Sequence, residues 1–144
     1  IEDIKAVNNQ VSCVLDKNSG SFAFQVPIKA FAFKNALMQE HFNESYLESD
    51  IYPKSTFKGK ILNWKDVKLT TQPQDIKIEG ELTMHGIKMS INEMGSISQK
   101  NSDIFGQCVF SVALRDFDIK VPKIVRENNA EVIKVTVKVD LVKK

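Results

Sequence analysis

Apolar and polar side chains alternate along most of this chain, whereas one stretch, residues 35–48, follows a helical spacing instead. A period of two places successive side chains on opposite faces of a sheet, so each alternating segment has one apolar face. Residues 133–141 show this best, with five apolar side chains separated by four polar ones. The pattern predicts an all-β fold, an antiparallel barrel that carries one helix near its mouth.

Residues 75–91 predict a hairpin with a defined register. The apolar residues have even numbers before residue 85 and odd numbers after residue 86: Ile76, Ile78, Leu82 and Met84, then Ile87, Met89 and Ile91. A two-residue turn at His85 and Gly86 places Met84 opposite Ile87 and Leu82 opposite Met89, which brings all of them to one face. This turn needs positive φ, which Gly adopts freely and His tolerates.

Further strands are expected over residues 4–15, 22–28, 56–64 and 105–115, which makes seven with 75–84, 87–91 and 133–141. The parity of the aromatic residues changes between Phe24 and Phe31, which predicts a bulge or bend near Lys29 and Ala30. Residues 116–122 are expected to form a short crossing segment, which is followed by a polar loop at 127–130. Closed up-and-down barrels usually have an even strand number, so seven predicts a further strand before Ile1, or a barrel open at that edge.

The helical stretch predicts a plug for one end of the barrel. Asn35 is a suitable N-cap, and Met38, Phe42 and Tyr46 recur every four residues with Leu37 beside them. Such an apolar stripe packs against the barrel end, and it can also act as a lid over a cavity. Both roles are compatible with the spacing.

The barrel interior is expected to be apolar. No charged residue has inward parity within 76–84, 87–91 or 133–141, so a guest there is held by burial. Gly59 and Gly80 also have inward parity, where they either leave space for a ligand or permit bending. Whether the interior is open or filled by its own side chains is left undecided by the sequence.

Composition excludes several classes of protein. The chain is long enough for one domain, 1–144, and its 20 Lys and Arg against 18 Asp and Glu give a net charge of +2 without a basic patch for nucleic acid. No run of 18 apolar residues predicts a transmembrane segment. Cys13 and Cys108 have no metal spacing and are expected to be free, buried thiols. No cofactor is expected.

One helix face offers an alternative function. His41, Glu44, Ser45 and Glu48 are spaced so that an imidazole and two carboxylates share a face, which suits a divalent metal or acid–base chemistry. The alternative hypothesis is therefore a metal-dependent enzyme or sensor. Surface helices often carry such acids, and His85 is interpreted as a turn residue, or as a contact to a ligand head group.

Three strings of sequence carry a family resemblance. They are ALMQEHFNESYLESDIYPKSTFKGKI at 36–61, GELTMHGIKMSI at 80–91 and LRDFDIKVPKIV at 114–125, and the most specific parts are LTMHG at 82–86 and YPKSTFKG at 52–59. These strings resemble the YceI-like polyisoprenoid-binding family, in the form with HFNE on the helix. The resemblance covers nearly the whole chain and implies an extended lipocalin-like barrel. Family members typically begin with an earlier strand, so the chain resembles an N-terminally truncated member.

The resemblance implies non-enzymatic binding of an amphiphilic lipid or polyisoprenoid for carriage, storage or sensing. It also implies a bacterial periplasmic or secreted location, with a signal peptide ahead of the region shown, while a dimer remains open. Parity and resemblance together select these candidate ligand-binding residues of the bore and mouth: Phe22, Phe24, Val26, Ile28, Leu37, Met38, Phe42, Phe57, Ile61, Ile78, Leu82, Met84, Met89, Phe110, Val135 and Val137.

Overall fold

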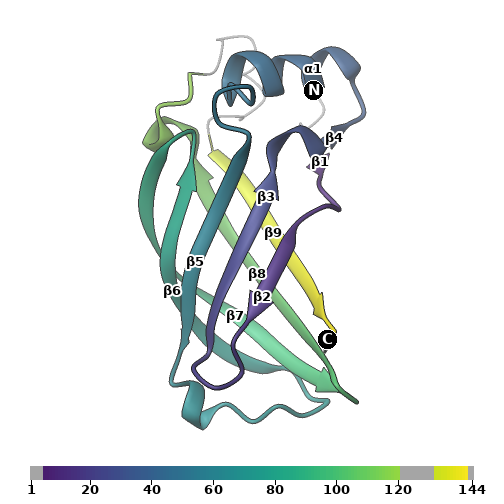
Figure 1. Cartoon of the computed structure of the whole chain (residues 1–144), viewed down its shortest axis with the longest axis vertical. Helices are drawn as coiled ribbons and strands as arrows, with labels where there is room; N and C mark the ends of the chain where they lie inside the picture. Colours follow the sequence, from purple (N-terminus) through teal and green to yellow (C-terminus); the bar gives the residue numbers. More distant parts are fainter. Residues whose placement is uncertain (1–4, 121–131, 143–144) are drawn as a thin grey trace.

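The computed structural model describes residues 5–120 and 132–142. Its main element is an antiparallel sheet of seven strands in the order β2-β3-β5-β6-β7-β8-β9. The strands are β2 (Ser12–Leu15), β3 (Ser21–Pro27), β5 (Lys54–Leu62), β6 (Gln74–Met84), β7 (Ile87–Lys100), β8 (Asp103–Ala113) and β9 (Val132–Leu141). The sheet curls on itself, so that β7 to β9 run behind β2 to β5 in Figure 1. We call the space that the curled sheet surrounds the bore.

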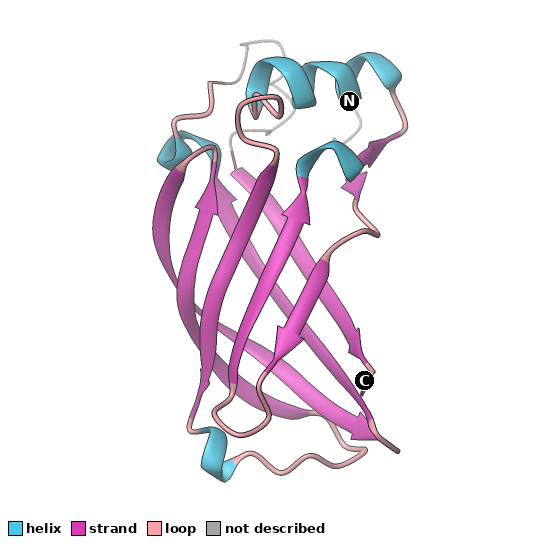
Figure 2. Cartoon of the chain, in the orientation of Figure 1, coloured by secondary structure: helices cyan, strands magenta, loops and turns pink. Residues whose placement is uncertain are grey.

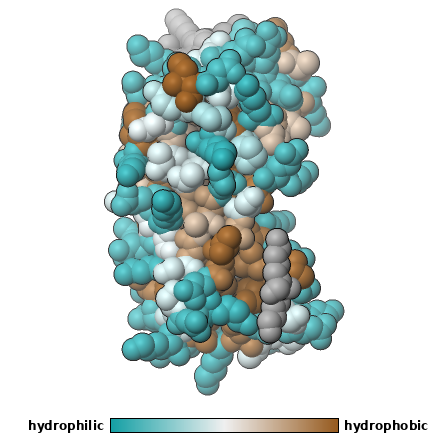
Figure 3. All heavy atoms as spheres, in the orientation of Figure 1, coloured by the Kyte–Doolittle hydropathy of each residue, from teal (hydrophilic) through white to brown (hydrophobic). Residues whose placement is uncertain are grey.

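The curled sheet is a half-barrel. Its edge strands β2 and β9 come close to each other, but in the described residues no ladder of backbone hydrogen bonds joins them. Figure 3 shows apolar surface in the lower half of the visible face, on the side where β2 and the end of β9 lie in Figure 1, and Val14 and Val142 are 71% and 65% exposed. The expected number of strands and the open edge are both found.

The hairpin forms with the predicted register. Met84 lies opposite Ile87 and Leu82 opposite Met89, and the turn residues His85 and Gly86 have φ of 55° and 76°. Positive φ at both turn positions suits the twist of a two-residue hairpin. The alternation of β9 is equally regular, since exposed and partly buried residues exchange at every position from Val132 to Leu141.

One expected strand differs from the structure, whereas the bend expected after Ile28 is present. The single strand predicted over 4–15 is broken into β1 (Ala6–Val7), which pairs with β4 (Ala32–Phe33) in a separate small sheet, and β2. Between them, the side chain of Asn8 donates a hydrogen bond to Pro27 O at 2.8 Å, and this polar contact replaces ladder pairing. The change of parity after Ile28 arises from a 3₁₀ turn, η1 (Ile28–Ala30), which is the bend of the two predicted alternatives and lies at the predicted place.

The helical segment lies across one end of the sheet (Figure 2). Helix α1 (Ala36–His41) begins at Asn35, whose side-chain oxygen accepts a hydrogen bond from Met38 N at 3.1 Å, as predicted for the N-cap. A π-helical turn, η2 (Phe42–Tyr46), continues it. The described part of the crossing segment includes η4 (Leu114–Phe117), while the polar loop predicted at 127–130 lies outside the described residues.

Buried apolar residues form two clusters, one at each end of the sheet. The cap cluster lies under the helical segment and comprises Ile28, Tyr46, Leu47, Met84, Val112, Leu114, Phe117 and Ile119. The base cluster comprises Ile61, Ile76, Ile97 and Ile104, and is closed by Trp64 of η3 (Trp64–Asp66), whose indole N–H donates to Lys17 O at 2.7 Å. The two ends of the bore are therefore packed, and its middle lies between the two clusters.

Candidate functional site

The middle of the bore is lined by apolar side chains that the protein does not bury completely. Phe24 of β3 and Val137 of β9 point inward between exposed neighbours, and Val26 of β3 and Phe57 of β5 share their inward side through the strand register. All four are only partly buried, and among the described residues none belongs to the cap or base cluster. A packed core would leave such side chains with little exposure. Their residual exposure shows that the middle is packed less completely than the two clusters.

Three phenylalanines form an aromatic wall on one side of the bore. The ring of Phe22 stacks on Phe57 with centroids 5.6 Å apart and meets Phe24 edge to face at 5.7 Å. The Phe57 ring also lies over Gly59 and Gly80, because a Cβ on either glycine would be 2.7 Å from it. The space at these glycines, which the sequence analysis assigned to a ligand or to bending, is therefore occupied by an aromatic ring.

The remaining predicted residues occupy three different environments. Ile78, Leu82, Met89, Phe110 and Val135 point inward and are partly buried. Ile78 packs against the base cluster and the other four against the cap cluster, which Met38 and Phe42 contact from the helical segment. Ile28, Ile61 and Met84 are between 3% and 9% exposed inside the packed clusters, so they support the ends of the bore and do not line its middle. Leu37 is 61% exposed and does not pack against the cap cluster. Its assignment to the bore is corrected.

Polar groups in the bore were missed by the sequence analysis. Glu93 continues the inward side of β7, with Ile91 before it and Gly95 after it, and lies opposite Ile78 of β6. The expected strand ended at Ile91, so Glu93 was not considered. Glu93 has the same odd parity as Ile87, Met89 and Ile91, and this parity was the signal that identifies it as inward. Cys13 and Cys108 are free thiols, as predicted, but they face the bore and are only partly buried. Burial raises the pKa of Cys13 to about 11, which keeps this thiol protonated.

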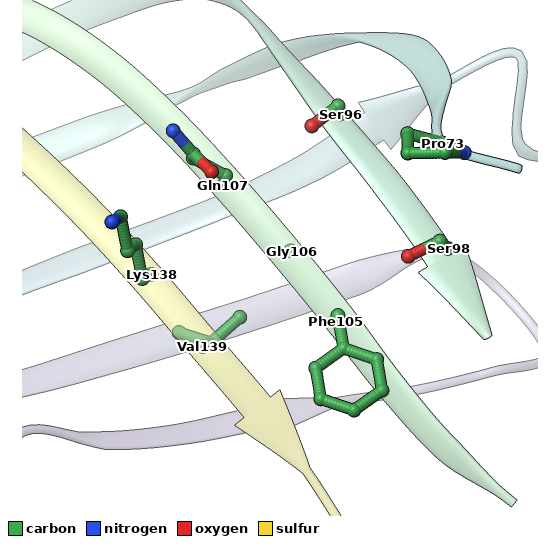
Figure 4. A pocket seen from close by; sticks show the side chains of 8 residues that line it. All are labelled: Pro73, Ser96, Ser98, Phe105, Gly106, Gln107, Lys138 and Val139. Atoms are coloured by element: carbon green, nitrogen blue, oxygen red, sulfur yellow. The ribbon is translucent and has the colours of Figure 1, made fainter. Parts of the chain in front are cut away.

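Two depressions on the outside of the sheet are poor candidates for a ligand site. The first, of about 240 Å³, is lined mainly by outward-facing side chains of β7, β8 and β9 together with Pro73, including Ser96, Phe105, Gln107 and Lys138 (Figure 4). The second, of about 170 Å³, lies near Asp66, Lys77 and Met94. Ligand pockets usually enclose about 300–1,000 Å³ and are concave and apolar. The bore remains the better candidate.

A histidine joins the helical segment to the hairpin and to η4. His85 Nδ1 lies 2.9 Å from Phe117 O, and His85 Nε2 lies 2.8 Å from Glu48 Oε1. Tyr52 packs edge-on against the imidazole at 4.9 Å, and the side chain of His85 is only 9% exposed. We call this arrangement of His85, Glu48 and Phe117 O the latch. His85 is the predicted turn residue, but the latch itself has no local signature in the sequence.

The latch favours the charged form of the imidazole. Burial lowers the pKa of His85, but the hydrogen bonds with Glu48 and Phe117 O and the negative charges of Glu48 and Asp118 outweigh burial and raise this pKa above its usual value. Both partners are acceptors, so the ring satisfies them together only when both nitrogens donate. The latch is therefore strongest when His85 is protonated.

The structure does not assemble the alternative site on the helix. Glu48 turns toward His85, and His41 stacks on Tyr46 with centroids 6.5 Å apart. In residues 5–120 and 132–142, no three His, Cys, Asp or Glu side chains are placed to hold a metal ion. Within the same residues, no helix has the length and apolar character needed to span a bilayer.

The curled antiparallel sheet, its apolar bore and its helical cover define a small lipocalin-like ligand-binding fold. The YceI-like domain matches residues 3–142 of this chain. The chain belongs to the YceI-like family. No curated protein matches it.

Solved structures share this fold at low sequence identity. A YceI protein from Campylobacter jejuni is 18% identical, with a TM-score of 0.77 over 100% of this chain and 87% of that one. A polyisoprenoid-binding domain from Saccharophagus degradans, implicated in plant cell wall breakdown, is 14% identical, with a TM-score of 0.70 over 90% and 78%. Burkholderia cenocepacia BcnA is 12% identical, with a TM-score of 0.74 over 92% and 83%. These likenesses establish the fold.

Proposed function

We propose that this protein binds an amphiphilic lipid or polyisoprenoid in the bore and carries, stores or senses it without catalysing a reaction. The observation that carries the proposal is the partial exposure of Phe24, Val26, Phe57 and Val137 between two buried clusters. Apolar surface that the chain leaves exposed inside its own fold is stabilised by an apolar guest. The polyisoprenoid-binding domain from Saccharophagus degradans, which has the same fold, supports this choice of ligand.

The energetics favour a chain-like ligand. Each buried CH₂ contributes about 0.8 kcal/mol, so a few isoprene units outweigh an association cost on the order of ten kcal/mol. The aromatic wall of Phe22, Phe24 and Phe57 offers flat apolar surface to such a chain along one side of the bore. Affinity then depends on chain length more than on the head group.

The proposal includes the place and the subtype of the protein. We assign the chain to the HFNE-containing form of the family, on residues 41–44, and to the bacterial envelope or the secreted fraction. Support for the location comes from family membership and from the bacterial sources of the structures with this fold. Fractionation of cells that express the full gene product tests the location.

A bore-filling substitution tests the proposed ligand site. Val137→Trp places an indole in the middle of the bore, whereas Thr136→Trp places the same group on the exposed outer face of the same strand. We expect the inward variant to lose at least about tenfold in affinity for farnesol, since it excludes the chain from the bore, and the outward variant to retain wild-type affinity. Isothermal titration calorimetry measures both, and circular dichroism verifies that each variant is folded.

Extraction provides a second test that needs no chosen probe. Organic extraction of the purified protein, followed by mass spectrometry, is expected to release an apolar molecule from wild type and less from Val137→Trp. Equal farnesol affinity in the two tryptophan variants contradicts the proposal, as does a wild-type protein that releases no lipid and binds no isoprenoid.

A further inference from the structure

The wall of the bore divides between β7 and β8. Their ladder runs from Lys100 and Asp103 only as far as Gly95 and Cys108. Beyond this point β7 remains paired with β6 up to the turn, and β8 remains paired with β9. Because β7 and β8 stay paired with their outer neighbours but no longer with each other, the two strands diverge beyond this point. We call the place where the ladder ends, at Gly95 and Cys108, the fork.

Polar groups of the wall meet at the fork. The Cys108 thiol donates a hydrogen bond to Met94 O at 3.4 Å, beside the last ladder pair. Gly95 keeps the wall thin here, because a Cβ on it would lie 3.0 Å from Ile78 Cδ1 and 3.5 Å from Cys108 Cβ. The nearest atom to such a Cβ is Gln107 O at 2.7 Å, so a side chain near this point meets both polar and apolar atoms.

Glu93 is that side chain. It is the inward residue directly above Gly95 on β7, it is partly buried, and it lies opposite Ile78. Within the described residues, no Lys, Arg or His nitrogen lies within 4.0 Å of its carboxylate. Glu93 is two residues from Gly95 along β7, so it lies beside the fork, and its negative charge adds to burial in raising the pKa of Cys108. The bore therefore contains one carboxylate without a cationic partner among these residues.

The chemistry of an ionised carboxylate determines which polar group it accepts. It offers only hydrogen-bond acceptors, so it pairs with a hydroxyl or ammonium donor. A phosphate placed beside it carries charge of the same sign and is repelled. We propose that Glu93 at the fork is a specificity site that accepts a hydrogen bond from an alcohol or amine on the bound apolar chain and disfavours a phosphorylated chain. This inference rests on the proposed function, because it concerns a ligand of the same bore.

Three probes with one apolar chain test this site. Farnesol, farnesylamine and farnesyl diphosphate, each below its critical micelle concentration, are titrated into wild type and Glu93→Gln. We expect wild type to bind the alcohol at least about tenfold more tightly than the diphosphate, and Glu93→Gln to reduce this ratio at least about tenfold through tighter diphosphate binding. If wild type, but not Glu93→Gln, binds farnesylamine more tightly than farnesol, the favoured donor is an ammonium group. If wild type binds the two with equal affinity, the favoured interaction is a hydrogen bond without a charge contribution. Either result supports the site.

Glu79→Gln is the matched control. Glu79 is exposed on the outer face of β6 opposite Lys60, so this variant loses the same charge outside the bore and keeps the wild-type ratio. Equal affinity of wild type for alcohol and diphosphate, or a ratio unchanged in Glu93→Gln, overturns the specificity site while the lipid-binding proposal stands. Failure of wild type to bind any of the three probes overturns both.

A ligand-free measurement tests the position of the carboxylate. In a Cys13→Ser background, Cys108 is the remaining thiol, and its rate of alkylation by iodoacetamide depends on its pKa. We expect Glu93→Gln to increase this rate near pH 8, because removal of the nearby charge lowers the pKa of Cys108. An unchanged rate places the carboxylate away from the fork and overturns the inference.

Discussion

The capped end of the sheet and the middle of its bore are built from the same alternating strands, yet they differ in how the inward side chains are used. At the capped end, Met84, Val112 and Leu114 are covered by the helical segment and are at most 9% exposed. In the middle, Phe24, Phe57 and Val137 lie on the same inward faces and stay partly exposed. The comparison teaches that alternation selects a face, whereas a second layer of structure determines whether that face becomes a core or a lining.

The latch adds a polar element to the same contrast. At the capped end, the buried imidazole of His85 has a partner for each nitrogen. In the middle, Glu93 has no cationic partner within the described residues. Satisfied polar groups stabilise a fold, while an unpaired charge on an apolar wall is available to a ligand.

The largest expected effect compares a phenylalanine in each region. Phe117 is 1% exposed in the cap cluster, so Phe117→Ala is expected to lower the free energy of unfolding by about 3–4 kcal/mol. Phe24 is partly exposed in the bore, and we expect Phe24→Ala to cost only about 1–2 kcal/mol, since less area and fewer contacts are lost. Urea denaturation of the two variants measures the difference. Equal losses break the comparison, because the middle is then packed as tightly as the cap.

A second pair tests how the bore is shaped. A Cβ on Gly80 would lie 2.5 Å from Lys58 O and 2.7 Å from Gly59 Cα, so backbone has to move, and we expect Gly80→Ala to cost about 2 kcal/mol. A Cβ on Gly106 would meet only Val139 Cγ2 at 3.0 Å and Ser96 O at 3.9 Å, so Gly106→Ala is expected to cost less than about 1 kcal/mol. Thermal denaturation of both variants measures the costs. A Gly80→Ala variant as stable as wild type shows that the backbone of β5 beside Gly80 moves at little cost and contradicts the prediction.

The smallest expected effect concerns the latch and depends on pH. The folded-state pKa of His85 is raised, so the latch contributes fully below the unfolded value of about 6.5 and is lost as the pH rises through the folded value. We expect Glu48→Gln to lower the free energy of unfolding by about 1 kcal/mol near pH 6, a modest amount because the Glu48 side chain is 42% exposed. Above the folded pKa the loss should shrink.

His41→Asn is the control for this pH dependence. His41 is the other histidine of the chain and is exposed, so its replacement is expected to leave the pH profile of wild type unchanged. Urea denaturation from pH 5 to pH 8 compares the three proteins. If the loss of unfolding free energy in Glu48→Gln increases with pH, its sign is opposite to the prediction. The latch then does not stabilise the capped end through a protonated His85.

Local patterns predicted much of the fold. The change of parity around His85 and Gly86 was enough to obtain the register of the β6–β7 hairpin, and Asn35 was recognised as the N-cap. The same reasoning missed the break before β2, because the hydrogen bond of Asn8 joins residues 19 apart in sequence. It assigned Leu37 to the bore because spacing on a short helix does not determine which residues of a stripe touch the sheet.

The sequence by itself determined which side chains share a face, since the period of two is a property of the extended backbone and needs no distant partner. Only the tertiary structure decided which inward side chains are buried and which remain as a lining, because that depends on where the helical segment and the base turn lie over the curled sheet. The tertiary structure also brought Glu48 to His85, 37 residues away, and ended the β7–β8 ladder beside Glu93. Both arrangements arise from the curling of the whole sheet and the placement of the segments at its capped end, which no local window of sequence contains.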